Sequence, residues 1–196
     1  MDMDANEMET ESVDKASASP LPLARSYQVE ALEIAMKQNT IVYLETGSGK
    51  TLIAIMLLRN YADLFRKPSP CFTVFLVPRV VLVSQQAEAL KMHTDLKVGM
   101  YWGAMGVDYW DSSTWKQQVD KYEVLVMTPD ILLRALSHSF LTLNMIKVLI
   151  FDECHHARGK HAYARIMKVS IKRSSQLENS ELIESSLKHR KSLYKK

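Results

Sequence analysis

The sequence predicts an α/β domain built on a doubly wound, mainly parallel sheet. Short, continuously apolar segments alternate with longer segments of helical periodicity, which is typical of a parallel sheet covered on both faces. One of the apolar segments leads into a glycine-rich turn and a Lys-Thr pair. The chain has 196 residues, of which 47% are hydrophobic, so it can bury a core and wholesale disorder is excluded.

The first helix and strand follow from spacing and residue type. Val29, Leu32 and Met36 recur at helical intervals, and residues 40–44 are β-branched and apolar. Pro129 marks the first turn of a later helix, and the helix over 112–121 is expected to begin near a Ser/Thr cap. The expected helices are 26–37, 50–65, 80–92, 112–121 and 129–136, and the expected strands are 40–44, 72–77, 96–101, 123–127 and 147–151.

Three segments differ in composition. Residues 1–19 hold six acids and one lysine and are expected to form a disordered acidic arm. Residues 20–168 form the expected domain. Residues 169–196 hold seven Lys/Arg and seven Ser, which predicts a solvated basic tail outside the core, with weak helical periodicity over 181–190. The net charge of +3 permits a nucleic-acid partner without requiring one.

Cysteine content and apolar runs bear on location. Two cysteines cannot form a disulfide framework, which favours an intracellular protein of the nucleus or cytoplasm. The longest apolar run, 52–58, is far shorter than the roughly 20 residues of a membrane-spanning helix.

A phosphate-binding loop is predicted after the first strand. Strand, glycine-rich turn, Lys-Thr and helix occur in the order that such a loop requires, although Leu44 stands where the common pattern has glycine. The glycines let backbone N–H groups face phosphates, and the lysine reaches the β- and γ-phosphates. A plain Gly/Ser turn is the weaker alternative. The loop residues are Thr46, Gly47, Ser48, Gly49, Lys50 and Thr51.

An acidic pair follows the last predicted strand. Asp152 is expected to bind Mg²⁺ together with the Thr51 hydroxyl, and Glu153 to orient or deprotonate the attacking water. Acids that only favour a helix start are the alternative. A metal site is a further alternative, but its candidate ligands fit no standard zinc spacing: Cys154, His155, His156 and His161.

A group of aromatic residues lies between the third and fourth predicted strands. Core and loop packing is the favoured interpretation, because most tryptophans are largely buried, and an RNA-stacking platform is the alternative. The group consists of Tyr101, Trp102, Tyr109, Trp110 and Trp115.

The two motifs together resemble those of superfamily 2 helicases of the DExH type: TGSGKT at 46–51 and DECH at 152–155. In that family another residue usually replaces the first glycine of the loop, as Leu44 does here. Further matches are RSYQ at 25–28, residues 77–85 and TPD at 128–130. Longer segments such as LETGSGKTLIAIMLL and IKVLIFDECHHARGKH are similar to the helicase domains of plant Dicer-type endoribonucleases, which act in RNA silencing and antiviral defence.

The resemblance implies a P-loop NTPase of the first RecA-like type. It assigns ATP and Mg²⁺ chemistry to Lys50, Thr51, Asp152 and Glu153, and adenine selection to Gln28 with Arg25. It also implies a double-stranded RNA partner whose backbone runs along Pro78, Arg79, Thr128 and Pro129. Arg79 departs from the family's frequent Thr, and a solvated helix-start arginine is the alternative for it.

The resemblance ends near residue 168. The family's motif III strand, a second RecA-like domain and the nuclease domains find no match in the remaining residues. The domain is therefore expected to be incomplete at its C-terminal end, with the middle of its sheet open and little ATP turnover. A non-catalytic decoy that binds RNA or a partner is the alternative function, and a small-molecule P-loop kinase is disfavoured.

Overall fold

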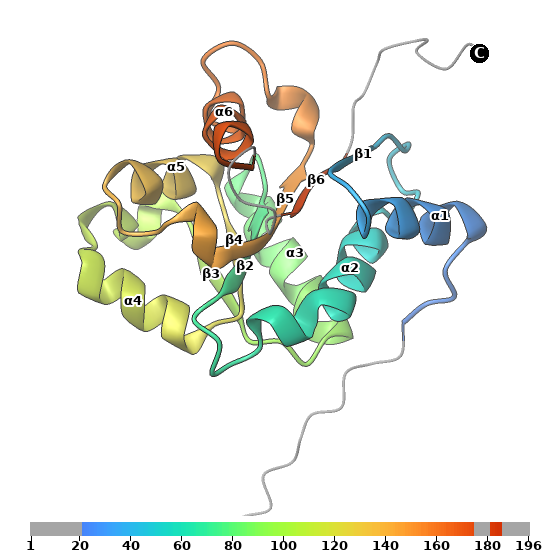
Figure 1. The fold of residues 1–196 in the computed structure, drawn as a ribbon, viewed down its shortest axis with the longest axis horizontal. Coiled ribbons are helices and arrows are strands. Elements are labelled where there is room, and N and C mark those ends of the chain that lie inside the picture. Colours follow the sequence, from blue (N-terminus) through green and yellow to red (C-terminus); the bar gives the residue numbers. More distant parts are fainter. Residues whose placement is uncertain (1–20, 175–180, 186–196) are drawn as a thin grey trace, which may run out of the picture.

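A parallel six-stranded sheet forms the centre of the computed structural model, which describes residues 21–174 and 181–185 (Figure 1). The strand order is β1-β6-β5-β2-β4-β3, and every neighbouring pair is parallel. The doubly wound α/β architecture is therefore confirmed. The strands are β1 Thr40–Val42, β2 Phe72–Leu76, β3 Val98–Tyr101, β4 Val124–Met127, β5 Ile146–Asp152 and β6 Glu181–Ser185.

The five expected helices are present with ends within two residues of the prediction, and two of them begin and end where they were predicted, whereas α6 was not predicted. The α-helices are α1 Ser26–Ala35, α2 Lys50–Phe65, α3 Val80–His93, α4 Ser112–Lys121, α5 Pro129–Ser137 and α6 Ala162–Ser174. Four single 3₁₀ turns complete the described elements: η1 Gly103–Met105, η2 Val107–Tyr109, η3 Leu143–Met145 and η4 Cys154–His156.

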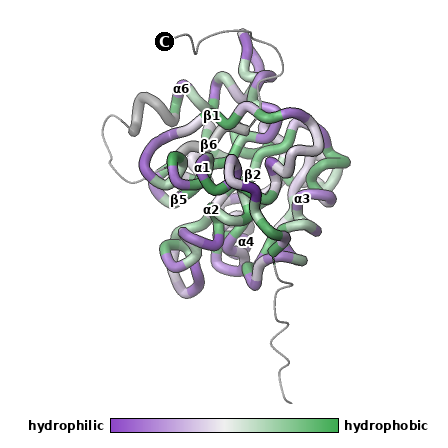
Figure 2. Tube along the Cα trace, turned by 90° about the vertical axis from the view of Figure 1, so that its right-hand side faces the viewer, coloured by the Kyte–Doolittle hydropathy of each residue, from purple (hydrophilic) through white to green (hydrophobic). Residues whose placement is uncertain are grey.

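Alternate side chains of the strands face opposite layers of helices. In β2, Phe72 and Leu76 pack with residues of α4, α5 and α6, whereas Phe75 packs with residues of α1, α2 and α3. All five residues of β2 are buried, as expected for a strand covered on both faces. Figure 2 shows the hydropathy of the described residues along the trace, in green for hydrophobic and purple for hydrophilic segments. The two layers hold the sheet and its connecting loops in place.

The sheet is closed where the sequence predicted a gap. β6 lies between β1 and β5, with Ile183 in register with Thr40 and Ile150. α6 continues past residue 168 to Ser174. The expectation of a solvated tail with helical periodicity over 181–190 is wrong for residues 181–185, which form a central strand of the sheet because β1 and β5 offer unpaired backbone groups that β6 satisfies. The acidic arm and the rest of the tail lie outside the described residues.

The start of α4 differs from the expected Ser/Thr cap. Asp111 is the N-cap, and its Oδ1 accepts from the Thr114 backbone N–H at 2.8 Å and from the Thr114 hydroxyl at 2.7 Å. These bonds, with those from Ser113, lower the pKa of Asp111 to about 2.

None of the described helices is long and apolar enough to cross a membrane.

Candidate nucleotide and nucleic-acid site

Apart from Arg25 and Gln28, which lie at the start of α1, the predicted site residues lie at or just after the carboxyl ends of strands. The phosphate loop follows β1, Arg79 follows β2, Thr128 follows β4, and Asp152 ends β5. Since the strands are parallel, these ends lie in one row along the carboxyl-terminal side of the sheet, where α/β folds bind ligands. This row of strand ends is called the sheet edge below. The strand order places the loop and the acidic pair on one half of this edge. It places the residues expected to contact RNA on the β2–β4 half.

The phosphate loop is shaped by its two glycines. Gly47 and Gly49 have φ values of +83° and +80°, in the region that side chains rarely adopt. A Cβ on Gly49 would also lie 2.4 Å from Gln28 Nε2. Gly49 is the N-cap of α2, so the positive end of the helix dipole faces the loop. The neighbouring Thr46 is exposed.

Lys50 lies across the backbone of its own loop. Its Nζ donates to the carbonyl oxygens of Leu44 at 3.0 Å and Glu45 at 3.1 Å. The Glu45 carbonyl also accepts from the Ser48 hydroxyl at 2.6 Å and from the Ser48 N–H at 3.3 Å. The lysine charge is thus held against two carbonyls at the beginning of the loop, and an entering phosphate competes with these carbonyls for it.

The beginning of α1 is hydrogen bonded to the loop. The Gln28 side chain is 4% exposed; its Nε2 donates to Ser48 O at 3.0 Å, and its Oε1 accepts from Arg25 N at 2.8 Å. The Tyr27 hydroxyl donates to Ser48 O at 2.8 Å, and Arg25 Nη1 donates to that hydroxyl at 3.2 Å. Sequence reasoning missed Tyr27, whose only signal was its position beside Gln28.

The two predicted Mg²⁺ ligands offer oxygen atoms, which this ion prefers. Asp152 is half-buried at the end of β5. The Thr51 hydroxyl donates to Gln86 Oε1 on α3 at 3.1 Å. Among the described residues, no cluster of three or more His, Cys, Asp or Glu side chains has metal-site geometry. A pair of oxygen ligands fits Mg²⁺, which takes its other ligands from water and substrate phosphates.

The acidic pair is fixed by a fully buried tyrosine. The Tyr163 hydroxyl lies 2.8 Å from the Asp152 carbonyl oxygen and 3.1 Å from that of Leu76. Burial raises the pKa of Tyr163, so the hydroxyl stays protonated and able to donate. The bond ties α6 to the carboxyl ends of β2 and β5. The sequence analysis had singled out no residue in α6.

Glu153 adopts a left-handed backbone conformation, with φ +54°. Its Oε2 lies 3.1 Å from His155 Nδ1. The neighbouring His156 ring stacks with His161 and lies tilted against His155, and burial together with these two histidines lowers the pKa of His156. Non-glycine residues in this backbone region concentrate at functional sites, because the strain needs support from their surroundings.

The residues expected to contact RNA differ in accessibility. Arg79 is exposed at the N-cap of α3 and makes no side-chain cap bond. Pro78 and Thr128 are half-buried at the ends of β2 and β4. Pro129 is buried at the first position of α5, where its fixed φ favours helix initiation. Arg79 is therefore an accessible positive charge on this half of the edge.

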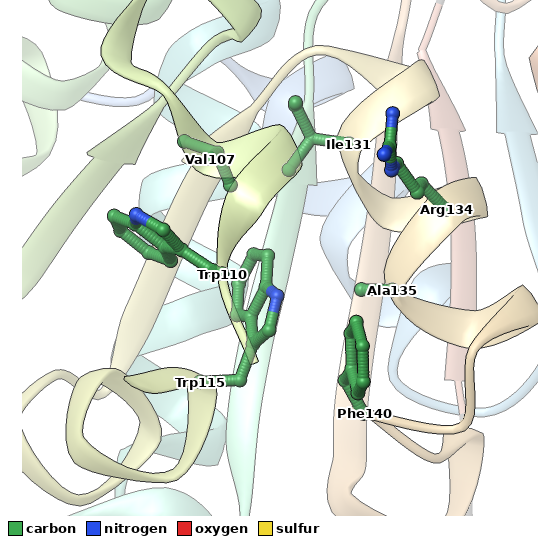
Figure 3. A pocket seen from close by; sticks show the side chains of 7 residues that line it. All are labelled: Val107, Trp110, Trp115, Ile131, Arg134, Ala135 and Phe140. Carbon is green, nitrogen blue, oxygen red and sulfur yellow. The ribbon is translucent and has the colours of Figure 1, made fainter. Parts of the chain in front are cut away.

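The aromatic group is mostly packed inside. Tyr101 and Trp115 are each 2% exposed, and Trp110 contacts both rings edge to face. The hollow beside Trp110 leaves about 10 Å³, which is room for no more than a water molecule and excludes a base. Only Tyr109, at 92% exposure, projects into solvent. Figure 3 shows the lining: Val107, Trp110, Trp115, Ile131, Arg134, Ala135 and Phe140.

Comparison with known proteins agrees with this arrangement. Residues 25–185 match the DEAD/DEAH box helicase family. The chain is 82% identical over 168 residues to Endoribonuclease Dicer homolog 2 of Arabidopsis thaliana, covering 86% of the chain and 12% of that protein. It is 50% identical over 145 residues to Dicer homolog 1 of the same plant, covering 74% and 8%. The expected resemblance to plant Dicer-type helicase domains is confirmed.

A solved structure shows the same fold. The helicase domain of Hef from Pyrococcus furiosus superposes with a TM-score of 0.69 at 26% identity, covering 87% of this chain and 34% of that one. The chain thus spans about an eighth or less of the two curated relatives named above and a third of this structural neighbour.

Proposed function

The chain belongs to the DEAD/DEAH box helicase family, and from this membership we propose that it binds ATP with Mg²⁺ in the phosphate loop and double-stranded RNA along the β2–β4 half of the same sheet edge. Its similarity to plant Dicer homologues supports an RNA ligand and a role in RNA silencing. The single observation that carries the nucleotide assignment is the position of Lys50 over a loop of two positive-φ glycines at the start of α2.

Nucleotide binding exchanges one set of partners for another. The Lys50 ammonium leaves the Leu44 and Glu45 carbonyls and binds the β- and γ-phosphates, which carry full negative charge. The N–H groups at the start of α2 and the Gly47–Gly49 turn bind the remaining phosphate oxygens. Gln28, anchored on Ser48, lies beside this loop and selects adenine, together with Arg25.

Thr51 and Asp152 hold the Mg²⁺. When bound, the ion supplies charge neutralisation at the phosphate oxygens. Glu153 orients the attacking water, and its link to His155 fixes the direction of its carboxylate. In phosphoryl transfer an arginine from a facing domain typically adds about 10³–10⁵ in rate. The described residues form one sheet, so we expect slow turnover from this chain alone.

RNA contacts the other half of the edge through its backbone. Arg79 is exposed where α3 begins, and an arginine can pair with a phosphate in bidentate geometry. Thr128 offers a hydroxyl where α5 begins. Contacts of this kind position a nucleic acid without reading its sequence, so we expect binding that is independent of base composition and weakens with salt.

Titration with a fluorescent ATP analogue tests the nucleotide assignment. Lys50→Ala is expected to lower the affinity at least tenfold, and Lys116→Ala, which removes an exposed lysine on α4, is expected to leave it unchanged. Equal affinity of the Lys50→Ala variant and the unaltered chain would reject the phosphate-loop assignment.

A gel shift with double-stranded RNA tests the second partner. Arg79→Ala is expected to weaken the complex several-fold, whereas Arg59→Ala, an exposed arginine on α2, is not. Binding that is unaffected by Arg79→Ala would place the RNA elsewhere. If RNA binding is strong, unaffected by ATP and unchanged in Lys50→Ala, the chain acts as a non-catalytic RNA-binding decoy instead.

A further inference from the structure

A buried amide on α3 is joined to the phosphate loop's threonine. Gln86 is 9% exposed, and its Oε1 lies 3.1 Å from the Thr51 hydroxyl oxygen. The two residues are 35 positions apart in the sequence and belong to α3 and α2. An amide oxygen has no proton to give, so the threonine hydroxyl is the donor. Neither the motif reasoning nor the phosphate-loop pattern assigns any role to Gln86.

A hydroxyl that binds a metal ion must send its proton elsewhere. It carries one proton and two lone pairs, and the ion takes a lone pair. If the hydroxyl hydrogen points toward the ion, its partial positive charge repels the cation and the oxygen cannot bind it. An acceptor on the side away from the ion receives the hydrogen bond, so that a lone pair of the hydroxyl oxygen is free to bind the ion. Gln86 Oε1 occupies the position of such an acceptor for Thr51.

The acceptor is rigidly held. Gln86 lies on the buried face of α3, whose neighbouring Val83, Ala87 and Leu90 are fully buried in the core cluster that includes α2. Threonine in a helix otherwise divides its χ1 between two rotamers, because the hydroxyl can also bond a backbone carbonyl of the preceding turn. A fixed partner on the adjacent helix selects one of the two.

We propose that Gln86 is a positioning residue for the Mg²⁺ site: it accepts a hydrogen bond from the Thr51 hydroxyl and thereby directs an oxygen lone pair toward the ion. This inference rests on the proposed function, since it deepens the ATP·Mg²⁺ assignment. Removing a residue that is hydrogen bonded to a metal-binding side chain, without itself binding the metal, typically lowers metal affinity about 10- to 100-fold.

The test is the Mg²⁺ dependence of nucleotide binding, measured with a fluorescent ATP analogue in EDTA and over a Mg²⁺ series. Gln86→Leu removes the acceptor at similar volume, and is expected to raise the half-saturating Mg²⁺ concentration about tenfold while changing the affinity in EDTA less than twofold. Gln86→Glu keeps an acceptor oxygen and is expected to stay within about threefold of the unaltered chain. Gln117→Leu, an exposed glutamine on α4 outside the motifs, is the matched control.

A double-mutant cycle separates positioning from general support of the fold. In a Thr51→Ala background, Gln86→Leu is expected to have no further effect on the Mg²⁺ response, because interacting residues are non-additive. An unchanged Mg²⁺ response in Gln86→Leu, or the same tenfold loss in both backgrounds, would overturn the role of Gln86 and leave the proposed function standing. If nucleotide binding by the unaltered chain does not depend on Mg²⁺, both the role of Gln86 and the proposed ATP·Mg²⁺ site would be overturned.

Discussion

The Tyr163 hydroxyl is hydrogen bonded to the carbonyl oxygen of Asp152, at 2.8 Å. The tyrosine is on α6 and the aspartate ends β5, so the bond fixes the carboxyl end of the strand that presents the acidic pair. The same hydroxyl lies 3.1 Å from Leu76 O at the end of β2. A single buried group therefore connects the nucleotide half of the sheet edge with the β2–β4 half.

Removing this hydroxyl is expected to weaken both the fold and the site. Tyr163→Phe should lower the free energy of unfolding by about 1 kcal/mol, since it deletes a buried hydrogen bond without creating a large cavity. It should also reduce Mg²⁺-dependent ATP affinity, because Asp152 loses its backbone anchor. Urea denaturation and analogue titration measure the two effects, with Tyr109→Phe at an exposed position as the control. An unchanged free energy of unfolding would contradict the role given to the bond.

Gln28 is expected to act on both the loop and the base. Gln28→Ala removes bonds to the backbone of the phosphate loop, so ATP and GTP affinities should both fall, by about five- to tenfold for a loss of roughly 1 kcal/mol. If the amide also reads adenine, the preference for ATP over GTP should narrow. Gln38→Ala, at an exposed amide beyond α1, is the control. If the affinities for ATP and GTP fall by the same factor, Gln28 supports the loop and does not select adenine.

The Asp111 cap predicts a pH-dependent contribution to stability. Hydrogen bonds from Thr114 and Ser113 hold the folded-state pKa of Asp111 at about 2, below its unfolded value. The contribution is therefore fully present above about pH 4 and is lost as the pH falls toward 2. Asp111→Asn should lower the melting temperature at pH 7, and the difference from the unaltered chain should shrink below pH 4. A pH-independent difference, or an equal effect of Asp120→Asn on the same helix, would contradict the cap.

β6 is expected to be needed for a stable sheet. A chain ending at Ser174 leaves facing backbone groups of β1 and β5 unpaired, each at about 1–3 kcal/mol when buried, against a total stability of about 5–15 kcal/mol. The melting temperature should fall sharply, or the transition should lose its cooperativity. A chain ending at Ser185 keeps the strand, and Ile183→Pro tests the pairing by a point change. Equal melting of the Ser174 and Ser185 chains would show that β6 does not contribute.

The parts that could be predicted from sequence are local in the chain. α2 begins at Lys50, as predicted, because the loop glycines, the Lys-Thr pair and the apolar helix are contiguous. The carboxyl-edge position of Asp152 follows from a single buried strand. Contacts of Gln86 and Tyr163 could not be predicted, because they join elements whose packing no local pattern specifies. β6 escaped prediction for the same reason, since its charged sequence becomes a strand through pairing with two neighbours.

The central claim is that ATP·Mg²⁺ binds at the loop between β1 and α2, and backbone amide NMR of the ¹⁵N-labelled chain during an ATP·Mg²⁺ titration tests it most directly. We expect the largest shifts at Gly47, Gly49, Lys50 and Thr51, a further shift at Asp152, and none along α4, which lies on the far half of the sheet. Saturable shifts confined to other elements, with the amides of 47–51 unmoved, would contradict the account.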